Sequence, residues 1–417
     1  MLSMSGDPSG ILAAMNLGKT LAVCLPIICA ISAAESASGA TLRVPSAYPT
    51  IDSGILAAQP GDTVLVAPGV YTGPGNRNIR MYGKPIVVMS EEGPEQTIID
   101  VQANFTAPAR GFIIDGSETA ASVLDGFTVI NGLMSTQPQL GGNRPHVGRS
   151  KPGLDAGWPH PERNELHDLS GGGLRVTFQS HPTIRNLIIR NCHSEVTGGG
   201  VAIEIDSAPT LIGCVIQDCT AAIQGGGLSI EFGAKPRVER CLITGNRAPL
   251  GGGVANDANP FTGSPPHFVE CTIASNFADD SGGGIFCFES SKSLFERVVV
   301  WGNCAGQQGG EILVEPFAQT SFACSVIDSS QIYSEGVVDF AKDNVFDIPP
   351  GFCMPDSCAS APSDLGDYGV SDASPCLAES SPCGLQIGGM GPGACATPDP
   401  VIDAGWGKLK SVLGKRR

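Results

Sequence analysis

The chain has 417 residues and a formal net charge of −16 at pH 7, yet only 16% of its residues are charged. An acidic chain without a basic stripe cannot offset the repulsion of phosphates, so these values exclude nucleic acid as a partner. Fifteen cysteines are many for a cytosolic protein and favour an oxidising compartment.

The first feature in chain order is an apolar segment at residues 21–31, with Lys19 before it and small residues at 38–40 after it. This order is typical of a secretory signal peptide. A membrane anchor is the alternative, but the apolar core is short and contains Pro26. We predict a signal peptide at 1–40, a secreted or cell-surface protein, and no transmembrane segment after its removal.

The mature chain begins with a strand at 42–44 and a short amphipathic helix at 48–58, which would shield the end of a stacked array. Specific phrases follow in a fixed order: Thr50-Ile51, Ala57 to Val64, Pro68 to Tyr71 and Thr97 to Asp100. This order resembles the opening of secreted bacterial right-handed parallel β-helix proteins of the pectin-lyase-like superfamily. A Pro/Gly/His-rich insertion at 133–170 then interrupts the pattern and is expected to form a long surface loop.

The most regular feature is a glycine triplet that recurs at Gly171, Gly198, Gly225, Gly251 and Gly282, in steps of 27, 27, 26 and 31 residues. A short alternating apolar run follows each triplet, and a second run follows about a dozen residues later. A period of this size indicates a stacked array, and the short β-branched runs leave no room for a helix pair. We predict an all-β fold, a single right-handed parallel β-helix over 41–350.

A looser resemblance concerns the same repeats. Gly-Gly-x-Leu/Val/Ile alternates with Ile-x-x-Asn, as at Ile243 to Asn246 and Ile273 to Asn276. This alternation is similar to the repeats of polymorphic outer-membrane proteins, which are surface adhesins.

Acidic residues recur in the first run after the triplet. Its alternate positions must point away from the core, and they include Glu204, Glu231 and Asp257 in successive coils. Stacked about 4.8 Å apart, like charges require at least one carboxylate with a raised pKa or a bound cation such as Ca²⁺. Adjacent members would approach the ~5 Å spacing of retaining carboxylate pairs, and the outer two the ~6.5–9.5 Å inverting spacing. The three residues are therefore candidates for catalysis or for calcium binding, and a solvated acidic face is the alternative.

Two further columns are interpreted as scaffold. Cys214, Cys241, Cys271 and Cys324 share a position with Leu187 and Val298 and are expected to be small buried hydrophobes. Asn246, Asn276 and Asn303, continued by Cys192 and Cys219, are expected to form an internal ladder of amides.

The C-terminal region changes composition. Residues 351–400 contain Cys353, Cys358, Cys376, Cys383 and Cys395, which predicts a disulfide-stapled cap whose pairing an odd number leaves open. A basic tail at 401–417 follows.

Two functional hypotheses remain from the sequence. The first is a scaffold that binds an extracellular polysaccharide or a cell-surface partner along its elongated face, as a monomer and without catalysis. The second is a polysaccharide lyase or glycoside hydrolase that acts through Glu204, Glu231 and Asp257. The chain lacks the Asn-Thr-Asp, Gly-His-Gly and Arg-Ile-Lys signatures of polygalacturonases and the Arg-x-Pro-x-x-Arg element of pectate lyases, so a β-helix alone does not establish an enzyme.

Overall fold

The computed structural model describes residues 39–136, 168–257, 265–288, 290–393 and 395. The predicted signal peptide up to residue 38, the insertion from 137 to 167 and the tail from 396 lie outside the described residues. No helix among the described residues is long and apolar enough to cross a membrane.

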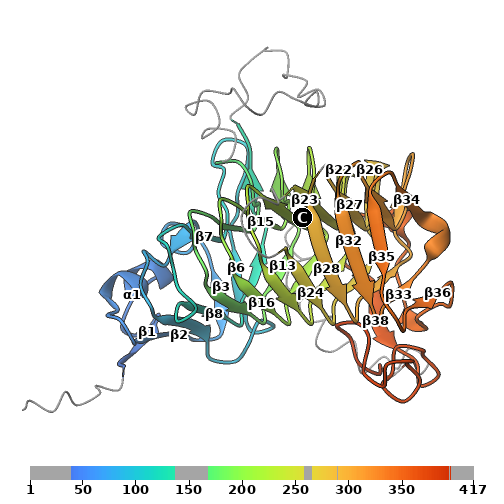
Figure 1. Ribbon diagram of the computed structural model, residues 1–417. Coiled ribbons are helices and arrows are strands. Elements are labelled where there is room, and N and C mark those ends of the chain that lie inside the picture. Colours follow the sequence, from blue (N-terminus) through green and yellow to red (C-terminus); the bar gives the residue numbers. More distant parts are fainter. Residues whose placement is uncertain (1–38, 137–167, 258–264, 289, 394, 396–417) are drawn as a thin grey trace, which may run out of the picture. The chain divides into compact units, whose positions relative to one another are not determined.

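Most of the described chain winds through stacked coils, and each strand of a coil pairs in parallel with the strand one coil away (Figure 1). A complete coil begins after its glycine triplet and contributes one strand to each of four sheets, here called sheets 1, 2, 3 and 4 in chain order. The two apolar runs predicted for each coil correspond to the strands of sheets 1 and 3. The strand predicted at 42–44 lies in sheet 2, but most strands of sheet 2 and those of sheet 4 were not predicted.

The strands of sheets 1 and 2 follow one another directly in each coil. Sheet 1 consists of β4 (Ile79–Arg80), β7 (Phe112–Ile114), β11 (Leu174–Val176), β15 (Val201–Ile203), β19 (Leu228–Glu231), β23 (Val254–Asp257), β27 (Ile285–Cys287), β31 (Ile312–Val314) and β34 (Ile332–Ser334). Sheet 2 consists of β1 (Thr41–Val44), β2 (Thr63–Val66), β5 (Val87–Ser90), β8 (Val123–Asp125), β12 (Thr183–Arg185), β16 (Thr210–Ile212), β20 (Arg237–Glu239), β24 (His267–Val269), β28 (Lys292–Glu296), β32 (Gln319–Ala323) and β35 (Val337–Phe340).

Sheets 3 and 4 complete the coil. Sheet 3 consists of β3 (Gly69–Tyr71), β6 (Thr97–Asp100), β9 (Thr128–Ile130), β13 (Ile188–Arg190), β17 (Val215–Gln217), β21 (Leu242–Thr244), β25 (Thr272–Ala274), β29 (Val299–Trp301), β33 (Val326–Ile327) and β36 (Val345–Phe346). The shorter sheet 4 consists of β10 (Leu133–Met134), β14 (His193–Ser194), β18 (Thr220–Ala221), β22 (Arg247–Leu250), β26 (Phe277–Ser281) and β30 (Cys304–Ala305).

The core lies inside the coils and consists of columns of inward-facing side chains that occupy the same position in successive coils. Leu174, Val201 and Leu228 pair in register and are fully buried, as the period-2 pattern predicts. An aromatic column runs through sheet 2, where Phe295 stacks on Phe268 at 4.8 Å and on Phe322 at 4.7 Å between ring centroids. Stacking extends burial from coil to coil, which one coil alone could not provide.

The two columns interpreted as scaffold are largely confirmed. Cys214, Cys241 and Cys271 are buried and unbridged. The Asn246 side chain donates to Oδ1 of Asn276 (3.0 Å), and Asn276 donates to Oδ1 of Asn303 (2.9 Å). The ladder ends at the buried Glu311, whose Oε2 accepts from the Asn303 amide at 2.6 Å. Burial raises the pKa of Glu311 to about 8, so its carboxyl is mostly protonated and uncharged at pH 7.

The placement of Cys324 in the cysteine column was wrong. The residue in register with Val298 one coil later is Ser325, not Cys324. The Ser325 hydroxyl accepts a hydrogen bond from the Val298 amide at 3.1 Å. Cys324 occupies the preceding corner with a φ of 51° and is bonded to Cys383. The shift of one residue turns its side chain from the core to the outside of the coil.

The N-terminal end of the stack is closed by helix α1 (Ile51–Ala57), which confirms the predicted helical cap. Thr50 and Ser53 form a capping box, and the inward-facing Ile51 and Ile55 are fully buried. At the other end of α1, the Lys84 ammonium donates to the carbonyls of Ile55, Leu56 and Ala58 at 2.8–2.9 Å.

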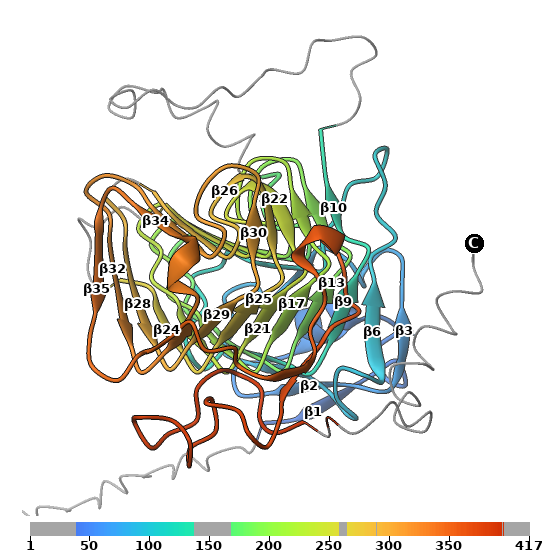
Figure 2. The same ribbon diagram turned by 90° about the vertical axis from the view of Figure 1, so that its right-hand side faces the viewer.

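The C-terminal segment, residues 352–393, folds back along the outer face of sheet 3, with an antiparallel pair of β37 (Phe352–Met354) and β38 (Asp367–Val370) (Figure 2). The short 3₁₀ helix η1 (Ser329–Gln331) precedes the segment in sequence, and η2 (Cys358–Ser360) lies within it, between β37 and β38. Two disulfides, Cys304–Cys358 and Cys324–Cys383, fasten the segment to late coils, and Cys353–Cys395 closes it on itself. Of the five cysteines in residues 351–400, Cys376 is left free and buried. Cys358 and Cys383 take their partners, Cys304 and Cys324, from the coils.

Candidate functional site

The outer face of sheet 1 carries the three predicted site residues, but it is not open to solvent. Glu204 is fully buried and Glu231 is 3% exposed, whereas Asp257 is exposed. Glu231 pairs in register with Asp257, and Glu204 directly follows β15, as the alternation predicted. The expectation that all three project into solvent was wrong for Glu204 and Glu231.

The cover over this face comes from the glycine-rich turns that precede β11, β15, β19, β23, β27 and β31. Its glycine lies so close to the strand that a Cβ added at Gly198 would be 2.9 Å from the Ala202 Cβ. The residue before the triplet also reaches over the face: Gln224 donates to Glu231 Oε1 at 3.4 Å, and the Thr197 hydroxyl bonds the same carboxylate. The triplet therefore forms a second layer over the outer face of sheet 1.

Under this layer lies a row of buried charged side chains, here called the seam, which consists of Arg110, Arg175, Glu204 and Glu231. Arg175, 5% exposed, donates from Nε and Nη2 to Glu204 Oε2 at 3.0 and 2.9 Å, and from Nη1 to Asp168 at 2.8 Å. Arg110, also buried, donates to the carbonyl of Asp168. Burial and the neighbouring Arg175 lower the pKa of Arg110 to about 9. Opposite charges thus balance most of the seam, as buried charges require.

Glu231 is the carboxylate without a cationic partner in this seam. Desolvation first, and then repulsion by Glu204, raise its pKa to about 7, while Ser229, Thr197 and Gln224 donate hydrogen bonds to it. The expected raised pKa in the acidic column is therefore confirmed. Among the described residues no group of three His, Cys, Asp or Glu side chains is arranged to hold a metal ion.

The outer face of sheet 2 differs, because most of the outward side chains of its middle strands are partly or fully exposed, with Val269 as a buried exception. In the early coils one outward column holds Thr41, Thr63, Val87, Val123, Thr183 and Thr210, and the other holds Arg43, Leu65, Met89, Asp125, Arg185 and Ile212. In the later coils the first column continues with Arg237 and His267, and the second with Glu239, Val269 and Glu296. These side chains form a network, here called the charged ladder: Glu239, Arg237, His267 and Glu296 from the strands, with Arg240, Glu270 and Arg297 at the adjoining corner.

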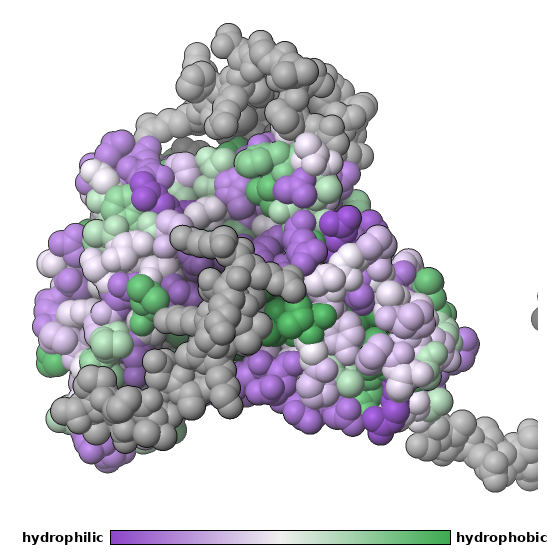
Figure 3. Space-filling model, turned by 180° about the vertical axis from the view of Figure 1, so that it is seen from behind, coloured by the Kyte–Doolittle hydropathy of each residue, from purple (hydrophilic) through white to green (hydrophobic). Residues whose placement is uncertain are grey.

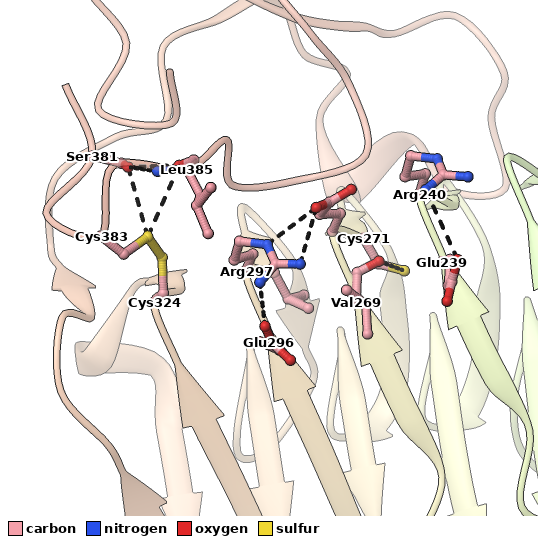
Figure 4. Close-up of polar contacts among 12 residues, drawn as sticks. Glu239, Arg240, Val269, Cys271, Glu296, Arg297, Cys324, Ser381, Cys383 and Leu385 are labelled. Atoms are coloured by element: carbon pink, nitrogen blue, oxygen red, sulfur yellow. Dashed lines mark hydrogen bonds and ion pairs between the residues drawn. A yellow bond between two sulfur atoms is a disulfide. The ribbon is translucent and has the colours of Figure 1, made fainter. Parts of the chain in front are cut away.

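Each contact of the charged ladder links neighbouring coils or neighbouring columns. Arg237 pairs with Glu239 and donates from Nη1 to His267 Nδ1 at 2.9 Å, and His267 Nε2 lies 3.5 Å from Glu296 Oε2. Arg297 pairs with Glu296 and reaches Glu270 Oε1 at 3.0 Å, while Arg240 reaches Glu239 at 3.8 Å (Figure 4). The ladder runs over three successive coils.

The protonation of His267 follows from its partners. Desolvation and the Arg237 charge lower its pKa below the ordinary value of 6.5, so the ring is neutral near pH 7. A guanidinium has no acceptor, so Nδ1 of His267 must accept from Arg237 and the proton lies on Nε2, toward Glu296. The lone pair on Nδ1 is therefore already engaged, and His267 is unsuited to act as a general base. The charged ladder is suited to recognition of hydroxyl-rich or charged groups.

This face was not predicted from the sequence, because the two predicted runs account for only two of the four strands of each complete coil. A signal was present: a proline stands before each of four strands of sheet 2, at Pro182, Pro209, Pro236 and Pro266. Proline next to a strand start marks a boundary, and each of these prolines precedes a separate three-residue strand.

The opposite side of the molecule is seen from behind in Figure 3. Hydrophobic residues form only small separate patches there.

The comparisons with known proteins agree with this geometry at the level of the fold. Residues 156–330 match the family model described as the right handed beta helix region. The fold is a right-handed parallel β-helix. Solved structures that resemble it include pectate lyase Pel9A, at 12% identity over 81% of this chain and 90% of that chain (TM-score 0.34). A glycoside hydrolase matches at 10% identity over 60% of this chain and 50% of that chain (TM-score 0.26). No curated protein matches. The predicted resemblance to pectin-lyase-like β-helices is thus confirmed for the fold.

Proposed function

We propose that this protein is an extracellular β-helix scaffold that binds a polysaccharide along the outer face of sheet 2. The observation that carries the proposal is the uncovered face itself. It carries threonines among apolar side chains in the early coils and the charged ladder in the later ones, and at about 4.8 Å per strand it extends for roughly 50 Å. A long surface of this kind suits an extended polymer better than a small molecule, which would need a concave pocket. The three disulfides among the described residues support an extracellular location.

Binding can be tested by affinity electrophoresis of the disulfide-bonded protein in gels that contain acidic or neutral polysaccharides. Arg237→Ala together with His267→Ala removes the centre of the charged ladder, and retardation by the cognate polymer should fall at least tenfold. Arg80→Ala is the matched control, because Arg80 is an ion-paired arginine of similar exposure on sheet 1 (41% against 46% for Arg237). Unchanged retardation in the double variant, or no retardation by any polymer, would contradict the proposal.

Cleavage of a polysaccharide through Glu204, Glu231 and Asp257 is the second candidate function. It is favoured by one observation, the pKa of Glu231 near 7, which suits a general acid at neutral pH. The engagement of Glu204 by Arg175 and the burial of both glutamates weigh against it. The same polymers can be assayed for new reducing ends with and without calcium. Activity that is lost in Glu231→Gln would support catalysis at the seam, and no activity in the wild type would leave binding as the function.

A further inference from the structure

The two ends of the stack are finished differently. Helix α1 closes the core at the N-terminal end, but the last coil ends in strands β34, β35 and β36, which pair only with the coil before them. Their outer edges carry backbone groups directed away from the stack, and such edges are templates for pairing with another strand. The C-terminal end is therefore the open edge of three sheets at once.

Apolar side chains are exposed at this end. Phe340 belongs in register to the inward column of Phe268, Phe295 and Phe322, which are 0–2% exposed, yet Phe340 is 38% exposed because no coil follows it. Phe346 packs edge-on against Phe340 at 4.9 Å and is 37% exposed. Val337 and Ile348 are 54% and 53% exposed. The aromatic core thus continues to the surface at the last coil.

The segment that follows the last coil does not cover it. From Phe352 the chain turns along the outer face of sheet 3, where Cys304–Cys358 and Cys324–Cys383 fix it (Figure 2). Gly388 donates to the carbonyl of Arg297, two coils back from β35. The described part of the segment that could have served as an end cap is tied to the side of the stack.

We propose that a second copy of this chain covers the open end, tail to tail, in place of the monomer expected from the sequence. A partner that pairs with the open edges of β34, β35 and β36 must itself present three strand edges arranged in a similar cross-section. The helix-capped N-terminal end does not present them, whereas another C-terminal end does. A two-fold axis places β35 antiparallel to its mate and closes the assembly at two copies, whereas head-to-tail stacking would continue into a filament. The rim is also self-complementary, because the exposed Asp339, Lys342 and Asp343 carry both signs on one edge.

The oligomeric state can be measured by sedimentation velocity and light scattering of the disulfide-bonded protein over a wide concentration range. A dimer is expected whose dissociation constant rises more than tenfold in Val337→Lys and in Phe340→Glu, because each buries a charge in the interface. Leu56→Lys is the matched control, since Leu56 is 55% exposed at the opposite end and should leave the dimer intact. Amide exchange of β35 should slow as the dimer forms.

A charge exchange guards against variants that merely unfold the last coil. Lys342→Asp alone should weaken the dimer, and adding Asp339→Lys should restore it, because the exchange only inverts the pairs across the two-fold axis. Thermal melts establish that each variant is folded. A monomer at all concentrations would overturn the proposal, and so would a dimer that the end variants do not weaken while Leu56→Lys does.

Discussion

The outer faces of sheets 1 and 2 occupy the same position relative to the core, yet they have opposite environments. On sheet 1 the glycine-triplet turn lies over the face, so Glu204 and Glu231 are buried and must be balanced by Arg175 and by hydroxyl or amide donors. On sheet 2 no described residues form such a layer over the charged ladder, and its ions remain partly exposed. Charges of the same chemical type therefore differ in energetic cost according to the turn beside them.

The largest expected effect is that of Glu204→Ala. The substitution leaves Arg175 buried beside Arg110, with only the exposed Asp168 as its partner, so the free energy of unfolding should fall by about 3–5 kcal/mol. Urea denaturation measures this change. Glu239→Ala, which removes a carboxylate from the charged ladder, is the control and should cost less than about 1 kcal/mol. Equal costs would show that the two faces do not differ.

The next effect is a pH dependence that comes from Glu231. Its pKa of about 7 in the folded state lies above the ordinary value of 4.5, so its contribution is fully present below about pH 4.5 and is lost as pH rises toward 7. The wild type should lose roughly 3 kcal/mol over this interval relative to Glu231→Gln, which cannot ionise. Denaturation at pH 5 and pH 8 compares the two proteins. Parallel profiles would place Glu231 in contact with water.

A smaller effect tests the layer that covers sheet 1. A Cβ at Gly226 would lie 2.5 Å from the carbonyl oxygen of Gly252 and 2.6 Å from that of Arg247, so Gly226→Ala must displace backbone in the next coil. We expect a loss of about 1–3 kcal/mol and faster amide exchange in β19. Gly391→Ala is the control, because its φ is outside the left-handed region and a Cβ there meets only the Gln386 side chain, at 3.7 Å. A smaller loss at Gly226 than at Gly391 would contradict a tightly packed cover.

The smallest effect is expected on the open face. Arg185 pairs with Asp125 on sheet 2, and its side chain is 45% exposed. Removing it by Arg185→Ala should change the free energy of unfolding by less than about 1 kcal/mol, because solvent screens the pair. A loss above 2 kcal/mol, measured by urea denaturation, would mean that sheet 2 is covered in solution.

These contrasts also explain what the sequence could predict. The triplet spacing and apolar columns were sufficient for the β-helix, since burial of Leu174 or Val201 follows from alternation alone. Alternation states which side of a sheet a residue faces, but not what covers that side, so the burial of Glu231 by Gln224 and Thr197 was not accessible. The disulfides illustrate the same limit, because Cys304 and Cys324 meet their partners only when the C-terminal segment folds back.

That returning segment has a consequence for how the stack loses structure. In a solenoid each coil contacts only its neighbours, so the terminal coil can detach while the rest remains folded. Here Asp364 pairs with Arg190 in β13 at 2.6 Å, Ser363 donates to Gly245, and Cys383 is bonded to Cys324. One strap thus spans coils from β13 to β33. Fraying of the last coils must also release contacts far upstream, and the array should melt as one cooperative unit.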